Sequence, residues 1–456
     1  MKKNRLQIAD CRLQIIKNWS LVIGHWSLVI FKFSNFQFSF FFFLIFNFQF
    51  SIFNSFSQTS TNSPYSQFGL GEIDAAINPQ NFALGRTGFA MNNPAYINLT
   101  NPASYASLDL TVFEVGASSN LNRLRNQTDT QKTRTSSFGY FVFGIPIKKW
   151  WGASFGLLPY SSTGYKLNTS EEITNIGTVQ YFNQGSGGIN KVYLGNGFKI
   201  KEILSIGVNA SYLFGAINKQ SRAIFDKSKV PFNTLIDNNI TAQGFAFDFG
   251  IQYKQKINDE WICNVGGVYG MNTKLKAQNE NFAATYISSN SELVFKDTLK
   301  NFTDTGKISL PQFFGFGFSV ENGDKWLFAM DYSKRFWSDY SALGQNEELK
   351  NSSQISFGVQ YCPERFGGMS FWKATQYRVG MRYADSYLQI KNIPIKEYGI
   401  SFGLGMPLKK SRSSVNLGFE IGKRGTIENG LILEEFISAK FGLTINDRWF
   451  IKRKYD

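Results

Sequence analysis

In the stretch FFGFGFSVENGDKWLFAMDYS, residues 313–333, every second residue is large and apolar. The other parity carries small or polar side chains, and the polar letters ENGD separate two such runs. Alternation with a period of two on both sides of a short turn is typical of a β-hairpin with two unlike faces. The question that the stretch raises is what the apolar face contacts.

The same alternation continues from residue 108 to the C-terminus. The 46 Phe and 20 Tyr, against only 11 Pro, favour strands over helices. We predict an even number of strands, fourteen in all: Leu110–Ala117, Ser137–Ile147, Gly152–Tyr165, Val179–Ile200, Leu204–Ala216, Thr241–Gln255, Trp261–Leu275, Ile308–Val320, Trp326–Trp337, Gln354–Tyr361, Tyr377–Ile390, Ile395–Leu408, Val415–Lys423 and Phe436–Ile445.

The connections between these strands are of two kinds. Some are tight, such as KINDEW and ENGDKW, and the others are longer and polar, such as NLNRLRNQTDTQKTR and FWSDYSALGQNEELKN. Short turns at one end and long loops at the other are typical of outer-membrane barrels. Trp337 borders a long loop, and the tryptophans beside the short-turn end form a predicted aromatic girdle: Trp150, Trp151, Trp261, Trp326, Trp372 and Trp449. We therefore predict an all-β protein, a transmembrane antiparallel β-barrel of about 14 strands over residues 108–456, located in the outer membrane of a Gram-negative cell with its apolar face on lipid.

Residues 1–57 are predicted to be a leader. A basic start is followed, after Lys32, by a run without charge that extends to Glu72. This order fits a secretory signal peptide cleaved near Ser57–Gln58. A single transmembrane anchor is the alternative, because the apolar run is long enough to span a bilayer. Tandem near-copies such as RLQI and WSLVI also leave open a translation start that differs from Met1.

Residues 58–107 lack strand alternation and are rich in Gly, Ala, Asn and Pro. The segment precedes the first strand, so it begins at the short-turn end and can fold back into the lumen as a plug. A flexible periplasmic linker is the alternative. For a plug, we expect the apolar side chains to line a binding cavity: Phe68, Leu70, Phe82, Leu84, Phe89, Met91 and Tyr96.

Two runs in and beside this segment resemble a known family. ALGRTGFAM followed by NPASYASLD resembles the N-terminal hatch of the FadL/TodX family of outer-membrane transporters of hydrophobic compounds. The resemblance implies a hatch-plugged barrel of fourteen strands and places the family's Asn-Pro-Ala motif on Asn101, Pro102 and Ala103. The C-terminal part, from YRVGMRY to FIKRKYD, is similar to FadL-like proteins of the group that also uses type IX secretion.

The predicted third strand contains a proline. Pro159 cannot donate a hydrogen bond to a neighbouring strand, and Gly156 and Gly164 on either side permit a bend. The FadL/TodX resemblance implies an inward kink here that opens the barrel wall sideways. A β-bulge at the rim of the barrel is the alternative.

Several charged residues fall on the parity that faces the lumen. Charges away from bulk water need partners, so we expect these to brace the barrel to the plug or to be solvated in the lumen, with direct contact to a substrate as the alternative: Asp248, Asp331, Arg378, Arg382, Glu420, Arg424 and Lys440.

The composition argues against several classes of function. The single His, His25, lies in the predicted leader, so a mature chain lacks the commonest general base. We expect no enzyme, no metal site and no cofactor. Without residues 1–57 the chain has 42 basic and 32 acidic residues, a net charge of +10, but these are scattered rather than clustered, which argues against nucleic-acid binding.

Two functions remain. The first is a monomeric channel that moves a hydrophobic, fatty-acid-like small molecule through a hatch-plugged barrel with a lateral opening. The second is a FadL-shaped interaction subunit of a secretion system, like the PorV-type subunits of type IX secretion, whose partner is another protein.

Overall fold

The computed structural model describes residues 61–449 except 74–76, 227–229, 290–291, 324, 365–370 and 409–410. The predicted leader and the proposed cleavage site lie outside the described residues. All described residues belong to one compact unit, residues 57–456. They form one closed antiparallel β-barrel of fourteen strands, as predicted, in which the last strand pairs with the first along Thr111–Arg125.

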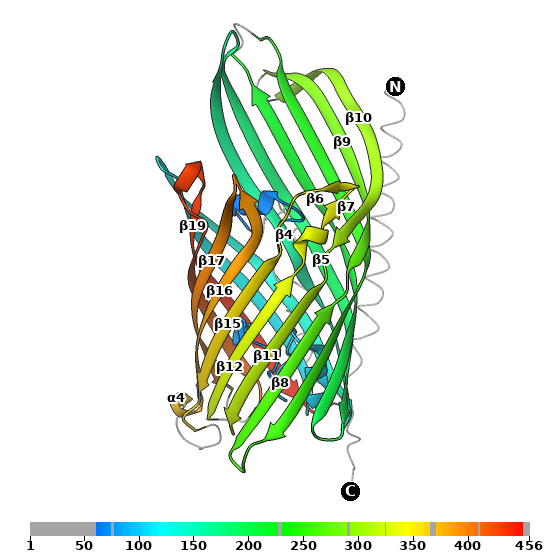
Figure 1. Ribbon diagram of the computed structural model, residues 1–456, viewed down its shortest axis with the longest axis vertical. Helices are drawn as coiled ribbons and strands as arrows, with labels where there is room; N and C mark the ends of the chain where they lie inside the picture. Colours follow the sequence, from blue (N-terminus) through cyan, green and yellow to red (C-terminus); the bar gives the residue numbers. More distant parts are fainter. Residues whose placement is uncertain are drawn as a thin grey trace, which may run out of the picture. The chain divides into compact units, whose positions relative to one another are not determined.

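The strands of the barrel follow one another in chain order (Figure 1). Their bounds are β2 (Thr111–Arg125), β3 (Thr130–Lys148), β4 (Trp151–Ile173), β5 (Gly177–Ile200), β6 (Leu204–Ile224), β7 (Asn233–Lys256), β8 (Trp261–Gly270), β9 (Thr273–Ser289), β10 (Glu292–Leu310), β11 (Phe313–Asn322), β12 (Trp326–Arg335), β15 (Ser352–Tyr361), β16 (Gln376–Ile390), β17 (Ile393–Pro407), β18 (Ser414–Arg424) and β19 (Leu433–Asp447). The remaining elements are short: η2 (Pro64–Gln67), β1 (Glu72–Ile73), α3 (Pro79–Phe82), η3 (Pro102–Ser107), η4 (Trp337–Asp339), β13 (Ser341–Ala342), β14 (Gln345–Asn346), α4 (Phe371–Ala374) and η5 (Glu428–Gly430).

Two of the fourteen strands are interrupted. β7 pairs with β9 along its first half and with β8 along its second half, so β8 and β9 together make one wall strand. β10 and β11 likewise make one strand, with Pro311 at the break. Because proline has no N–H to donate, the ladder is interrupted at that point. These breaks fall inside two of the predicted strands, Trp261–Leu275 and Ile308–Val320.

The two faces predicted from the alternation are present. In the hairpin of β11 and β12, Phe316 is 63% exposed on the outside, whereas Ser319 and Asp331 are buried on the inside. Exposed Phe, Ile and Met side chains continue around the barrel, as on the lipid-facing band of transmembrane barrels. Trp337 is different, because it is 2% exposed and stacks on Tyr387. This tryptophan belongs to the interior and not to an outer girdle.

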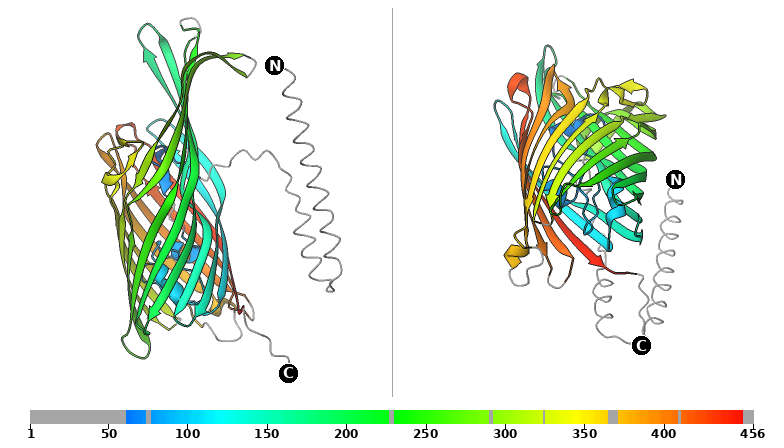
Figure 2. Two further views of the ribbon diagram at one scale, coloured as in Figure 1. Left: turned by 90° about the vertical axis from the view of Figure 1, so that its right-hand side faces the viewer. Right: turned by 60° about the horizontal axis from the view of Figure 1, so that its bottom comes forward.

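The prediction of long loops was wrong in two places. The stretch NLNRLRNQTDTQKTR is a continuation of β2 and β3 around a tight turn at 126–129, and residues 276–307 are mostly strand, in β9 and β10. β4 to β7, β9 and β10 therefore rise beyond the rest of the barrel (Figures 1 and 2). These extensions carry polar residues on both faces, so they lack the alternation by which the other strands were recognised.

Residues 61–107 form short pieces against the inner face of the wall. η3 contacts β5 and β6, and α3 contacts β17, β18 and β19. We call described residues 61–73 and 77–107 the inner segment. No helix among the described residues is long and apolar enough to cross a membrane.

Candidate functional site

The Asn-Pro-Ala motif fastens the inner segment to itself and to the wall. Asn101 caps η3, since its Oδ1 accepts from the Ala103 N–H at 3.0 Å and Pro102 occupies the first position of the helix. Its Nδ2 donates to the carbonyl oxygen of Phe89 at 2.7 Å and to that of Ile251, on β7, at 3.2 Å. It also donates to the carbonyl oxygen of Gly267, on β8, at 3.4 Å, so one buried amide joins two turns of the inner segment and two strands of the barrel.

A second attachment lies at Asp331 on β12. Its Oδ2 accepts hydrogen bonds from the backbone N–H groups of Gly88 (2.6 Å) and Phe89 (3.0 Å). Bonds from two successive N–H groups to one buried carboxylate are of the charge-assisted, strong kind. Asp331 is therefore one of the predicted lumen charges that braces the inner segment.

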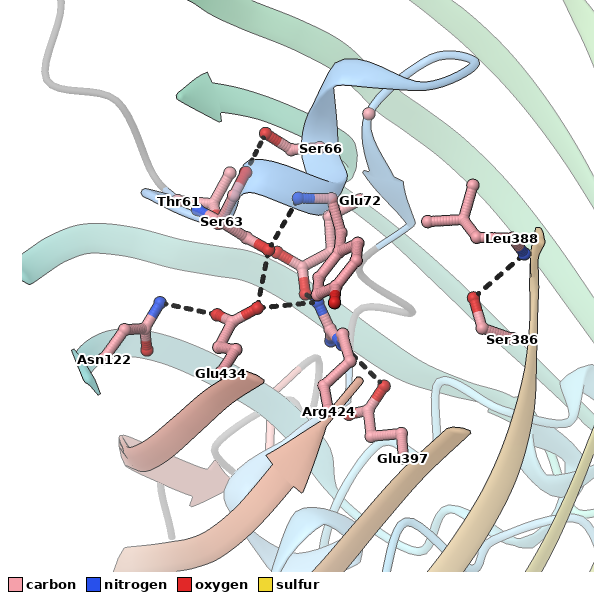
Figure 3. A network of polar contacts seen from close by, with 12 residues as sticks. Thr61, Ser63, Ser66, Glu72, Asn122, Ser386, Leu388, Glu397, Arg424 and Glu434 are labelled. Atoms are coloured by element: carbon pink, nitrogen blue, oxygen red, sulfur yellow. Dashed lines mark hydrogen bonds and ion pairs between the residues drawn. The ribbon is translucent and has the colours of Figure 1, made fainter. Parts of the chain in front are cut away.

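The most extensive attachment is a network of ion pairs (Figure 3). Arg424 on β18 pairs with Glu72 of the inner segment and with Glu397 on β17, the latter at 3.0 Å. The same guanidinium lies 3.7 Å from Glu434 on β19. Thr61 donates to Glu72 at 2.8 Å, and Ser63 donates to Glu434 at 2.7 Å.

The network continues through Arg382 on β16. Arg382 pairs with Glu397 and, at 2.8 Å, with Glu420, which also pairs with Arg86 of the inner segment at 3.4 Å. Three arginines and three glutamates therefore alternate from Glu72 to Arg86, and Glu434 branches from Arg424. Buried charges are tolerated when each is paired and hydrogen-bonded, and here the pairing fixes two separate points of the inner segment to three neighbouring strands.

The remaining predicted charges have smaller roles. Arg378 hydrogen-bonds Gln360 on β15 at 2.8 Å and Asn416 on β18 at 3.0 Å. Lys440 donates to the carbonyl oxygen of Ile77 at 3.5 Å. Asp248 lies 3.9 Å from Lys191 at the edge of a cavity.

Two of the cavities between the inner segment and the wall are large. The larger, about 330 Å³, lies toward the long-loop end and has an aromatic lining that includes Tyr160, Trp337 and Tyr387. The smaller, about 220 Å³, is lined by Ser137 and Phe138 on β3 and by Pro159 and Ser162 on β4. Both cavities touch Glu72, Ile73, Arg86, Glu397 and Arg424, so the ion-pair network lies between them.

The wall is incomplete beside the smaller cavity. The ladder between β3 and β4 runs from Lys148 and Trp151 to Phe141 and Leu157 and ends there. Beyond that point β3 stays paired with β2, and β4 with β5. Pro159, the predicted site of a kink, lies two residues after Leu157, the last residue of β4 that pairs with β3. The register of β4 against β5 shifts between Pro159 and Ser161.

The inner segment covers this gap from within. Ile73 pairs with Ser161 and Glu72 pairs with Ser162, so β1 takes the place beside β4 that β3 has left. Opposite Thr163, Gly187 on β5 has φ +106°, a conformation that L side chains rarely adopt. Of the predicted kink residues, Pro159 lies at the gap, whereas Gly156 is still paired with β3 and Gly164 lies beyond β1.

The predicted apolar lining residues divide into two groups. Phe89 lines the larger cavity and Phe82 the smaller one. Phe68 and Leu70 belong to a core with Trp337 and Tyr340, while Leu84, Met91 and Tyr96 pack with Leu327 and Ala329. Their part in binding a ligand stays a prediction, and in this arrangement Leu70 and Leu84 contact other side chains rather than open space.

Sequence reasoning missed several residues of the site. Glu397 shares the inward parity of Ser401, and Glu434 shares that of Lys440, so extending the alternation by a few residues would have found both. Tyr160, Trp337 and Tyr387 carry no such signal, because their inward positions depend on the bend of β4 and on the loop after β12.

Tyr65 is a further contact that the sequence did not indicate. Burial raises its pKa to about 12, with Glu434 adding to the effect. The hydroxyl therefore stays protonated at neutral pH and donates to the carbonyl oxygen of Ile432, between β18 and β19. Among the described residues, no group of three His, Cys, Asp or Glu side chains could hold a metal ion.

Comparison with known proteins gives the family. Residues 40–456 match the family model of BamG. The chain belongs to the BamG family. The predicted likeness to FadL/TodX proteins thus holds for the fold, whereas the family that matches is BamG. Among curated proteins, none matches the chain in sequence.

Solved structures of similar fold include a transporter, a FadL homologue and a hydrocarbon channel. The toluene transporter TodX of Pseudomonas putida is 15% identical with a TM-score of 0.55, over 82% of this chain and 97% of that chain. A FadL homologue of Pseudomonas aeruginosa is 11% identical with a TM-score of 0.55, over 82% and 98% of the two chains. The monoaromatic hydrocarbon channel CymD is 14% identical with a TM-score of 0.53, over 82% and 98%. At these identities the likeness shows the fold.

Proposed function

We propose that this protein is a monomeric outer-membrane channel for hydrophobic small molecules, with residues 58–107 as its plug and residues 1–57 as a leader that is removed. The single observation that carries the proposal is the gap between β3 and β4, which meets an internal cavity and is bridged from within by β1 of the inner segment. The similar folds of the monoaromatic hydrocarbon channel CymD and the toluene transporter TodX support a hydrophobic cargo.

The proposed path has two stages. A ligand enters the larger cavity from the long-loop end, where Tyr160, Trp337 and Tyr387 offer aromatic faces suited to an apolar molecule. It then passes Ile73 to the smaller cavity and leaves through the gap at Pro159 into the lipid. Passage requires β1 to move away from β4, which disturbs the ion pair of Glu72 with Arg424, while the ion pair of Arg86 with Glu420 holds the remainder of the plug.

A reversible tether between β1 and β4 tests this path. Ile73 and Ser161 are direct partners, so Ile73→Cys with Ser161→Cys, in a chain whose Cys263 and Cys362 are replaced by serine, can form a disulfide across the gap. We expect uptake of a fluorescent fatty acid by proteoliposomes to stop on oxidation and to return on reduction. Each single-cysteine variant serves as the control. Undiminished uptake with a fully formed disulfide would exclude a path through the gap.

A second candidate, the interaction subunit, is favoured by one other observation. From residue 293 to residue 305 every residue of β10 is exposed, and over this range β9 is the only strand among the described residues that pairs with it. An exposed strand edge can accept a strand from another protein. If this is the function, deleting the protein should impair export of a partner, whereas the tethered variant should support export normally.

A further inference from the structure

A groove of about 540 Å³ lies on the outward face of the wall, where β6, β7, β9 and β10 run side by side (Figure 1). Phe214, Gln243, Lys276 and Lys307 contribute to its lining. These side chains face away from the inner core, since their strand neighbours Leu213, Ala242, Leu275 and Ile308 are the ones that pack inside. The groove is therefore separate from the two internal cavities.

The groove contains a pair of like charges. Lys276 on β9 and Lys307 on β10 are direct cross-strand partners, and Lys274 follows on the same face. All three are exposed, and among the described residues none of them has an ion-pair partner. The carboxylate of Glu280, further along the same face of β9, accepts a hydrogen bond from Asn239. Like charges directly opposite each other destabilise a sheet, so this pair is better accommodated by an anion bound between the two lysines.

The position of the lysines relative to the apolar band is informative. On the outward face of β7, Tyr253, Ile251, Phe249, Phe247 and Phe245 are exposed in succession. The next outward residues are Gln243, whose strand partner is Lys276, and Thr241. The lysines therefore lie immediately beyond the apolar band, on the side of the long loops. In a barrel with short periplasmic turns, this is the level of the outer-leaflet headgroups.

Aromatic side chains continue the groove into the apolar band. The ring of Tyr212 lies 6.0 Å from that of Phe214 and 5.1 Å from that of Phe245, measured between centroids. The Tyr212 hydroxyl also hydrogen-bonds Gln243 at 2.9 Å. Cations above an aromatic surface match an amphiphile whose anionic head lies beside its acyl chains.

We propose that this groove binds the phosphate of an outer-leaflet lipid between Lys276 and Lys307, with the lipid's acyl chains against Phe214 and Phe245. The inference rests on the outer-membrane location in the proposed function, but not on transport. Phosphate oxygens accept charge-assisted hydrogen bonds from both ammonium groups and remove their mutual repulsion. The lipid would also reinforce the wall at the base of the extended strands.

Lipid binding can be measured by native mass spectrometry on the membrane-purified protein in detergent. We expect retention of lipid A that carries its phosphates, and not of dephosphorylated lipid A or inorganic phosphate. The double variant Lys276→Gln with Lys307→Gln should bind about a hundredfold more weakly, about tenfold for each of the two charge-assisted hydrogen bonds that it removes. Lys296→Gln with Lys300→Gln, which removes two exposed lysines of β10 outside the groove, is the matched control and should bind as the wild type does.

Thermal unfolding gives a second measurement of the same site. Without lipid A, Lys276→Gln should melt no lower than the wild type, because it removes a repulsion. With lipid A, the wild type should gain more stability than the variant. Equal binding by the double variant and the wild type, or equal binding of dephosphorylated lipid A or of free phosphate, would overturn the proposal. A protein that binds lipid A yet fails to transport would contradict the proposed function and leave this inference standing.

Discussion

At the scale of single residues, the small side chains on the inward face have a common cause. The backbone of the inner segment lies directly against the wall, so a Cβ added to Gly380 would fall 2.0 Å from the Gly85 nitrogen. A Cβ added to Gly207 would fall 2.4 Å from the Ala103 nitrogen. Inward glycines therefore leave space for a second layer of backbone, which is a use of glycine distinct from its freedom in turns.

Neighbouring glycines on β8 make this argument testable. A Cβ on the inward Gly266 would lie 2.0 Å from the Phe89 carbonyl oxygen, whereas a Cβ on the outward Gly267 would meet only the Ile251 side chain, at 3.1 Å. We expect Gly266→Ala to lower the free energy of unfolding by about 1–3 kcal/mol through overpacking and to increase protease cleavage within residues 61–107. Gly267→Ala is the control and should be close to neutral in urea unfolding. Equal effects of the two substitutions would show that the inner segment does not press on this strand.

At the scale of elements, the sequence predicted those parts of the fold that have two unlike environments. β11, β12, β16 and β17 have lipid on one side and the inner segment on the other, so their residues alternate. The upper half of β10 is exposed on both faces from residue 293 to residue 305, and no pattern separates it from a loop. The sequence predicted part of the ion-pair network, because Arg382, Glu420 and Arg424 follow the inward parity. It did not predict the pairing with Glu72, because that pairing depends on the path of the inner segment.

The outward face of β17 supplies a test of the membrane-spanning assignment. Phe402 is exposed near the middle of the strand, and Phe402→Arg should cost about 2–4 kcal/mol if this position lies near the midplane of a bilayer. The inward neighbour Ser401 is an unsuitable control, since it hydrogen-bonds Gly85 and Ala83 of the inner segment.

Gln354→Arg is the better control, because Gln354 borders both internal cavities, which leave space for a longer polar side chain. Folding into lipid vesicles, followed by gel mobility, measures both variants. If the two arginines were equally damaging, the assignment of the faces would be wrong.

At the scale of the whole molecule, the barrel is closed by strand pairing at its seam but open between β3 and β4. Continuous pairing of β19 with β2 shows that the fourteen strands suffice to close the wall. The gap is thus a local interruption of the strand pairing. It begins where the ladder between β3 and β4 ends at Leu157, and two residues of β1 bridge it from inside. A protein whose only function was to present a surface to a partner would not need a gap between β3 and β4.

Pro159→Val therefore distinguishes the two candidate functions. Valine restores an N–H and favours the extended conformation, so the ladder between β3 and β4 can lengthen and narrow the gap. For a channel, we expect slower uptake of a fluorescent fatty acid by proteoliposomes, with thermal stability equal to or above that of the wild type. Pro146→Val, within the paired part of β3, should leave uptake unchanged. If Pro159→Val left uptake unchanged and deletion of the protein impaired export of a partner, the interaction subunit would be the correct function, and the gap would need another explanation.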